Sequence, residues 1–307
     1  MKTESTLEKI LAAGHLAVTS ECGPPRGALP NKVKEKAELL RGCVDGINVT
    51  DNQTAMVRMS SLAACIIIQN MGLNPILQMV SRDRNRLAMQ SDIIGAYSHG
   101  VDTMLCLSGD HPRFGDHPMA ANVHDIDSIQ MVDMVRNMRD EGKFQGGEKI
   151  DGSPKMFIGA AANPFADPFE LRVARLAKKV KAGVDFIQTQ CIFNVDKFEK
   201  WMEGVRERGL HEKVAIMAGI TPMKSVGMAR YMKNKVPGMD VPDEVVQRMA
   251  GVPKEKQSEE GIKICVETIQ RLKEVEGVRG FHIMAIEWEQ KVPEIVERAG
   301  LLPRPVV

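Results

Sequence analysis

The segment Ser20–Gly27 places a carboxylate where a predicted strand must end. Glu21 follows the apolar run Leu16–Val18, and Pro24 and Pro25 stop the strand because each fixes φ and lacks a backbone donor. Burying a carboxylate at a strand end is costly unless the group is paired or used. Glu21 is therefore either a solvated loop residue or a functional acid.

Polar side chains also follow the other apolar runs of the chain. They are carboxylates, amides and hydroxyls: Thr50 and Asp51, Gln78 and Ser81, Ser108 and Asp110, Asn163 and Asp167, Gln188 and Gln190, and Glu287. If the runs are parallel strands, their carboxyl ends meet at one face, as in a barrel. The pattern then predicts a polar ligand-binding face and favours a functional reading of Glu21.

Two of these residues, Asp110 and Gln190, could have either a structural or a ligand-binding role. Asp110 follows Gly109 in a tight turn, where glycine lets the backbone approach a ligand closely, although aspartate also caps turns and helices. Gln190 lies within an apolar run, so its amide either serves as a structural hydrogen bonder or reads a ligand.

Basic residues recur at helical spacing further along the chain, at Arg175, Lys178 and Lys179. They form either a solvated helix face or a cationic clamp for a phosphate group. The six cysteines are scattered without a C-x-x-C pair, which argues against a zinc ribbon or an iron–sulfur cluster in this chain. We expect no metal site, and most cysteines should be small buried hydrophobes.

Short apolar runs alternate with helical patterns along the whole sequence and must position these residues. The predicted strands are 15–22, 46–50, 75–80, 103–107, 155–162, 185–190, 214–220 and 280–286. The predicted helices are 31–41, 56–70, 83–98, 126–139, 168–182, 195–208, three between 224 and the last strand, and 289–299. Eight units in 307 residues predict an α/β fold, a single (β/α)₈ TIM barrel over residues 1–307 with extra helices before strand eight. The alternative, an open doubly wound sheet, lacks its G-x-G-x-x-G after the first strand.

Composition limits the classes of function. The net charge of +1 argues against a dedicated nucleic-acid surface. No stretch approaches the roughly 20 apolar residues of a membrane span, and the polar N-terminus lacks a secretory signal, so we expect a cytoplasmic protein. The 20 methionines indicate a methionine-filled core or, alternatively, a pocket for a flat ligand.

Several motifs in order resemble those of one enzyme family. Glu21–Arg26 looks like Glu-x-x-Pro-Pro-Arg, Ser108–Asp110 like Arg-Gly-Asp, and Ala161–Pro164 like Ala-Ala-Tyr-Pro. Thr189-Gln190 and Gly219–Pro222 look like its Thr-Gln and Gly-Ile-x-Pro. Together they make the chain similar to the methylenetetrahydrofolate reductase family of flavin-dependent barrels.

This resemblance implies a reaction and its residues. Glu21 would protonate N10 of 5,10-methylenetetrahydrofolate, and reduced flavin would deliver hydride from N5 to the methylene carbon, giving 5-methyltetrahydrofolate. Asp110 would lie between flavin and folate, and Gln190 would bind the folate. The residues implied to hold flavin, as FMN or FAD, are Thr50, Gln78, Ser108, Gly109, Asp110, Ala161, Asn163, Asp167, Arg175, Lys178 and Lys179.

Departures from the family pattern bear on the electron donor. Val226 stands where nicotinamide-using members carry a stacking Phe, and Met284 and Glu287 replace a Tyr and an Asn. The resemblance is therefore to the type that works with a separate electron-supplying subunit. We expect an iron–sulfur partner protein, and we expect a homo-oligomer. The alternatives are a folate-dependent barrel methyltransferase and a flavin-free, non-catalytic paralogue that acts as an assembly subunit.

Overall fold

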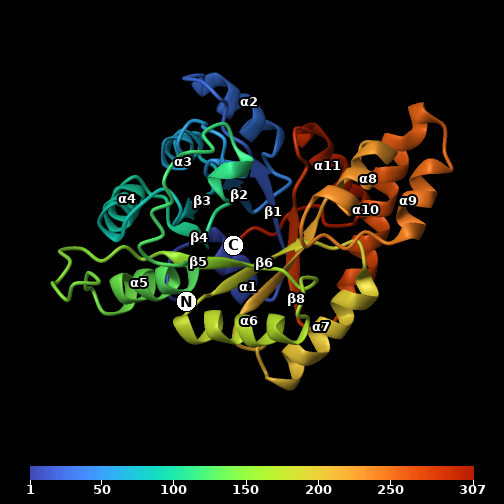
Figure 1. Cartoon of the computed structure of the whole chain (residues 1–307). Helices are drawn as coiled ribbons and strands as arrows, with labels where there is room; N and C mark the ends of the chain where they lie inside the picture. Colours follow the sequence, from blue (N-terminus) through green and yellow to red (C-terminus); the bar gives the residue numbers. More distant parts are fainter.

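Eight parallel strands form a closed barrel in chain order (Figure 1). The computed structural model describes residues 1–307. The strands are β1 Ala17–Cys22, β2 Gly46–Val49, β3 Pro75–Val80, β4 Thr103–Leu107, β5 Phe157–Ala162, β6 Phe186–Cys191, β7 Ala215–Ile220 and β8 Val278–Ile283. The barrel closes where β1 pairs with β8, with Ala17 opposite Gly280. The predicted (β/α)₈ fold is confirmed.

Helices surround the barrel and connect its strands. They are α2 Pro30–Leu39, α3 Ser61–Gln69, α4 Arg86–Ser98, α5 Ser128–Asp140, α6 Glu170–Ala182, α7 Val195–Glu207, α8 Val226–Lys235, α9 Asp243–Ala250, α10 Gln257–Lys273 and α11 Val292–Arg298. The extra helices predicted before the last strand are α8 and α9, which project from one side of the barrel ahead of α10 (Figure 1). No helix is both long and apolar enough to cross a bilayer.

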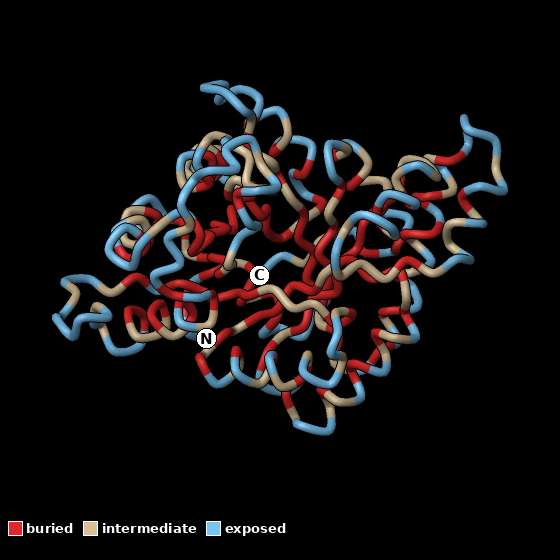
Figure 2. The backbone as a smooth tube through the Cα atoms, in the orientation of Figure 1, coloured by how far each residue is buried: buried red, intermediate tan, exposed pale blue.

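The main core lies between the strands and the surrounding helices. Its buried residues concentrate along the strands and the inner helix faces, while the outer faces are exposed (Figure 2). Methionines contribute to it from several elements, including Met89, Met134 and Met202. All six cysteines are free and buried, as predicted. The methionine-filled core expected from composition is therefore present.

A short helix that the sequence patterns did not predict, α1 Thr6–Ala12, covers the amino-terminal end of the barrel. Leu7 and Ile10 pack in one cluster with Phe157 and Phe186 from the barrel interior. These apolar contacts fill the lower part of the barrel, and a ligand cavity therefore has room only at the carboxyl ends of the strands.

Most predicted elements differ from the observed bounds by a few residues, and two of the differences lie close to the site. The helix expected over 56–70 begins only at Ser61, where the Ser60 side chain caps it by accepting from the Ala63 N–H. The chain before it forms the 3₁₀ segment η1 Gln53–Ala55, with positive φ at Asn52, Thr54 and Ala55. The strand expected over 280–286 is β8 Val278–Ile283; the Met284 N–H still donates to the Ile220 carbonyl of β7, and a turn follows at Ile286 and Glu287. Both differences fall in loops at the carboxyl face of the barrel.

The carboxyl-terminal segment is tied to the start of β1 and β2 by a buried ion pair. The Arg304 guanidinium lies 2.6 Å from the Asp45 carboxylate, and their side chains are 9% and 3% exposed. Asp45 also accepts a hydrogen bond from the backbone N–H of Val18. The pair therefore joins three segments of the chain.

We expect Arg304→Ala to lower the free energy of unfolding by about 3 kcal/mol, because it leaves Asp45 buried without its cation. Arg298→Ala removes two surface ion pairs, with Glu259 and Glu294, of an arginine side chain that is 34% exposed, and should cost less than about 1 kcal/mol. Urea unfolding followed by circular dichroism measures both. Equal losses for the two variants would contradict the importance of burial.

Candidate active site

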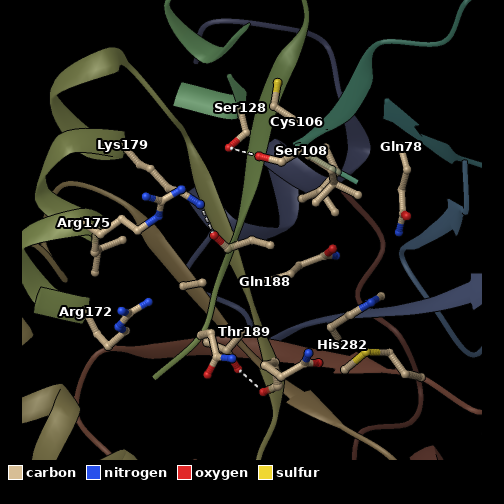
Figure 3. A pocket seen from close by; sticks show the side chains of 18 of the residues that line it. Gln78, Cys106, Ser108, Ser128, Arg172, Arg175, Lys179, Gln188, Thr189 and His282 are labelled. Carbon is tan, nitrogen blue, oxygen red and sulfur yellow. Dashed lines mark hydrogen bonds between the residues drawn. The ribbon is translucent and has the colours of Figure 1, made fainter. Parts of the chain in front are cut away.

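A cavity of about 340 Å³ opens among the carboxyl ends of the strands (Figure 3). Its wall brings together eight of the residues predicted from the sequence: Glu21, Gln78, Ser108, Ala161, Asn163, Arg175, Lys179 and Gln190. Gln188, one of the polar residues expected at the strand ends, lines it as well, and so do residues that sequence reasoning did not assign to the site, among them Ser128, Arg172 and His282. The polar face predicted from the strand ends is therefore a real concavity.

Glu21 lies at one end of this cavity, next to the last residue of β1. Its side chain is 26% exposed, so the carboxylate faces the cavity rather than bulk water. The Nε2 atom of His282 on β8 lies 3.5 Å from its Oε1 atom, and the imidazole is buried. A carboxylate at a barrel rim with a histidine beneath it is suited to holding or transferring a proton.

A buried layer of polar side chains supports His282 from below. Thr19 Oγ1 lies 2.9 Å from His282 Nδ1, and Gln188 Nε2 donates to Thr19 Oγ1 at 3.0 Å. Gln188 and Asn48 also exchange two amide hydrogen bonds, of 2.8 and 3.0 Å. When the Thr19 hydroxyl donates to His282 Nδ1, the neutral imidazole carries its proton on Nε2, which faces Glu21.

Gln190 lines the same cavity from the last part of β6. Gln188, two residues earlier on the same face of the strand, lies deeper and joins the buried layer, whereas Gln190 is half-buried. The register between β6 and β7 shifts between Gln188 and Cys191, next to Gln190. Its Oε1 accepts a hydrogen bond from the Cys191 N–H at 3.2 Å, which orients the amide. Bulges commonly re-aim a side chain next to an active site.

The two cysteines that flank Glu21 and Gln190 are not nucleophiles. Burial raises the pKa of the Cys22 thiol and of the Cys191 thiol to about 12. Both therefore remain protonated near neutral pH and act as small apolar packing groups.

The opposite end of the cavity is basic. Arg172, Arg175 and Lys179 point into it from α6 (Figure 3). Their spacing of three and four residues puts them on one helix face, whereas Lys178, beside this face, is exposed and does not line the cavity. The spacing was the signal in the sequence that could have added Arg172 to the predicted clamp, but it does not by itself exclude Lys178, which follows Arg175 by three residues.

Lys179 is the most buried cation of this group. Its Nζ donates to the Ala161 carbonyl, and the residue is only 7% exposed. Burial, together with the charge of Arg175, lowers the pKa of Lys179 to about 8. Ser108 and Ser128, whose hydroxyls lie 3.2 Å apart, add neutral donors beside it. The group offers charge and hydrogen bonds that suit an anion such as a phosphate.

Five predicted residues lie outside the cavity wall: Thr50, Gly109, Asp110, Asp167 and Lys178. The Thr50 hydroxyl donates to Gln53, and the Asp110 carboxylate accepts the Thr54 N–H at 2.9 Å. The Asp167 carbonyl accepts from Arg172 at 3.0 Å. Thr50, Gly109, Asp110 and Asp167 belong to loops that surround the cavity, and Lys178 lies on the exposed side of α6.

The fold and the cavity define a (β/α)₈ barrel protein that binds a ligand at the carboxyl ends of its strands, the face where barrel enzymes carry their active sites. The sequence model described as "Methylenetetrahydrofolate reductase" matches residues 6–300. The chain therefore belongs to the methylenetetrahydrofolate reductase family, as its motifs suggested.

Curated relatives carry the same family name. A probable methylenetetrahydrofolate reductase (NADPH) of Caenorhabditis elegans is 22% identical over 96% of this chain and 44% of its own length. Methylenetetrahydrofolate reductase 2 of Schizosaccharomyces pombe is 28% identical over 68% of this chain and 33% of its own length. The chain thus spans less than half the length of these relatives.

Solved structures agree on the fold. An uncharacterized protein from Clostridium thermocellum, described as binding two copies of 5-methyl-5,6,7,8-tetrahydrofolic acid, superposes with a TM-score of 0.62 at 13% identity. That match covers 96% of this chain and 98% of the other. At this identity the likeness establishes the shared barrel architecture.

We expect the basic end to bind a phosphate monoester more weakly as pH rises through about 8, the pKa of Lys179. The ammonium attracts the anion below this pH and is neutral above it, while the monoester, with a second pKa of about 6, stays a dianion. Calorimetric titration with phenyl phosphate should show an affinity about fivefold lower at pH 9 than at pH 7.

Lys179→Met should abolish this pH dependence, and Lys178→Met should retain it because Lys178 is exposed and does not line the cavity. A pH profile that is unchanged in Lys179→Met would contradict the assignment.

Proposed function

We propose that this chain catalyses the flavin-dependent reduction of 5,10-methylenetetrahydrofolate to 5-methyltetrahydrofolate. The observation that carries the proposal is one cavity with a histidine-backed carboxylate at one end and a basic wall at the other. Membership of the methylenetetrahydrofolate reductase family supports it. The Clostridium thermocellum barrel, described as binding a methylated tetrahydrofolate, supports the same substrate class.

The side chains of the cavity fit a flavin, as FMN or FAD. Arg175 and Lys179, with Arg172 beside them, would hold a phosphate group, since guanidinium and ammonium groups bind phosphate strongly. Gln78 and Ser108 also line the cavity and would contact polar groups of the flavin ring. When bound, the flavin supplies the hydride for the reduction.

Glu21 would act as the general acid for N10 of the folate. His282 faces its carboxyl group and restrains its position, with Thr19 and the buried amides holding the imidazole in turn. Protonation of N10 opens the five-membered ring to a 5-iminium cation, which is the electrophile that accepts hydride. Gln190, oriented through the Cys191 N–H, would hydrogen-bond the pterin. Asp110 at the rim would favour the cationic iminium through its negative charge.

We further propose that the electrons come from an iron–sulfur partner subunit. No Phe, Tyr or Trp lines the cavity, so a nicotinamide ring would find no aromatic side chain to stack on. Val226 begins α8, and Met284 occupies the cavity wall after β8. Some relatives are named as NADPH or NADH enzymes, so the donor of this chain needs its own test.

Glu21→Gln should leave flavin binding and electron exchange with dyes intact, because the basic wall is untouched. Reduction of methylenetetrahydrofolate should fall about 100-fold or more, since the amide cannot supply the proton. Stopped-flow reoxidation of the reduced flavoprotein by the folate measures the step. Loss of flavin from this variant would instead make Glu21 structural, and a wild-type protein that takes up no flavin would favour the methyltransferase alternative.

Anaerobic mixing of the flavin-loaded chain with NADH or NADPH tests the donor. We expect no rapid bleaching of the flavin absorbance near ~450 nm, because the cavity offers no stacking aromatic. Reduction should require the partner subunit. Rapid bleaching by either dinucleotide alone would overturn the proposed partner while leaving the proposed reaction in place.

A further inference from the structure

Arg82 is a buried arginine that connects three loops at the carboxyl face of the barrel. It lies just after β3, and its side chain is 3% exposed. Its Nη1 donates to the Asp110 carbonyl at 2.8 Å, and its Nη2 lies 3.4 Å from the Asn52 carbonyl. Its Nε and Nη2 also bond both oxygens of Asp83 at 2.6 Å. The guanidinium thus contacts the loops after β2, β3 and β4 at once.

The backbone at Arg82 holds the loop after β4 at both ends. The Arg82 N–H donates to the Ser108 carbonyl at 3.1 Å, continuing the pairing of β3 with β4. The Arg82 carbonyl accepts from the Val123 N–H at 2.8 Å. The loop that carries Asp110 is therefore hydrogen-bonded to the Arg82 backbone near its beginning, at Ser108, and near its end, at Val123.

The turn at residues 52–55, which contacts Asp110, has a strained backbone. Asn52, Thr54 and Ala55 have φ of 44°, 57° and 56°, a region that costs energy for side chains other than glycine and most for a β-branched one. Asp110 Oδ2 accepts the Thr54 N–H at 2.9 Å, and Asp83 accepts from the Asn52 amide at 3.3 Å. Such conformations persist only where neighbouring groups hold them.

We infer that Arg82 is a positioning residue that holds Asp110 and the 52–55 turn in register with the cavity. The inference rests on the proposed function, in which Asp110 acts on the bound folate. Arg82 touches no ligand itself and acts through the Asp110 carbonyl and through Asp83. Gly109 adds to the constraint, because its φ is +86° and a Cβ there would lie 3.0 Å from Val80 Cβ and 3.2 Å from Arg82 Cβ.

Hydrogen exchange on the ligand-free chain gives a readout that does not depend on activity. In Arg82→Lys the ammonium cannot reach the Asp110 and Asn52 carbonyls and Asp83 together, so amides 53–57 should exchange about tenfold faster. Arg84→Lys is the matched control, because Arg84 pairs with Asp51 and Asp92 and makes no contact with Asp110. Unchanged exchange at 53–57 in Arg82→Lys, or an equal increase in Arg84→Lys, would overturn the inference.

Asp83→Asn provides a second variant if Arg82→Lys does not fold. The Asp83 side chain is 33% exposed, so its replacement is tolerated better than that of the buried arginine. The neutral amide weakens the hold on Arg82, and exchange at 53–57 should rise in the same residues by a smaller factor. Exchange equal to that of the wild type in a folded Asp83→Asn protein counts against the inference.

A double-mutant cycle with Asp110→Asn separates this inference from the proposed function. If Arg82 acts through Asp110, Arg82→Lys and Asp110→Asn should each slow folate reduction about tenfold, and the double variant should be no slower than Asp110→Asn alone. A double variant whose rate loss is the product of the two single losses would overturn the positioning role. A fully active Asp110→Asn variant would instead refute the role proposed for Asp110, and the exchange data would still decide whether Arg82 holds the turn.

Discussion

The hydrogen-bonded layer of Thr19, Asn48, Gln188 and His282 is the interaction on which the candidate site depends. It crosses the barrel interior from β1 and β2 to β6 and β8, and its members are buried. Buried polar groups destabilise a protein unless each finds a partner, so the four side chains constrain one another. The consequence is a rigid polar floor directly beneath Glu21. Below it the barrel is apolar and covered by α1, and above it the cavity begins.

The two ends of the cavity above this floor carry opposite charges. One end carries the Glu21 carboxylate, and the other carries three cations from a single face of α6. An elongated ligand with an anionic end is oriented by such a division before any specific contact forms. Burial of Lys179 adds a further property, because the low pKa of about 8 makes its charge responsive to the binding of an anion. Strands supply the reactive end and a helix supplies the anion-binding end.

The rim is built differently from the floor. Its loops after β2, β3 and β4 are joined by charged groups, with Arg82 and Asp83 at the centre and Asp110 at the edge. Loops lack the repetitive hydrogen bonding of the sheet, so their positions depend on such side-chain contacts. The non-glycine residues with positive φ at 52, 54 and 55 lie where these contacts converge. The site therefore combines a fixed interior with a rim whose geometry rests on a few ion pairs and hydrogen bonds.

The sequence by itself determined the eight-stranded barrel, because apolar runs and helical periodicity report burial locally, and it located Glu21, Gln190, Arg175 and Lys179 through strand ends and helix spacing. It did not reveal α1, the bounds of α3, or the turn at 52–55, since these depend on contacts between distant segments. Only the tertiary structure brought His282 beneath Glu21 across 261 positions of sequence and turned Asp110 toward Thr54. Barrel closure pairs the first strand with the last, and no local pattern records which of their side chains then meet.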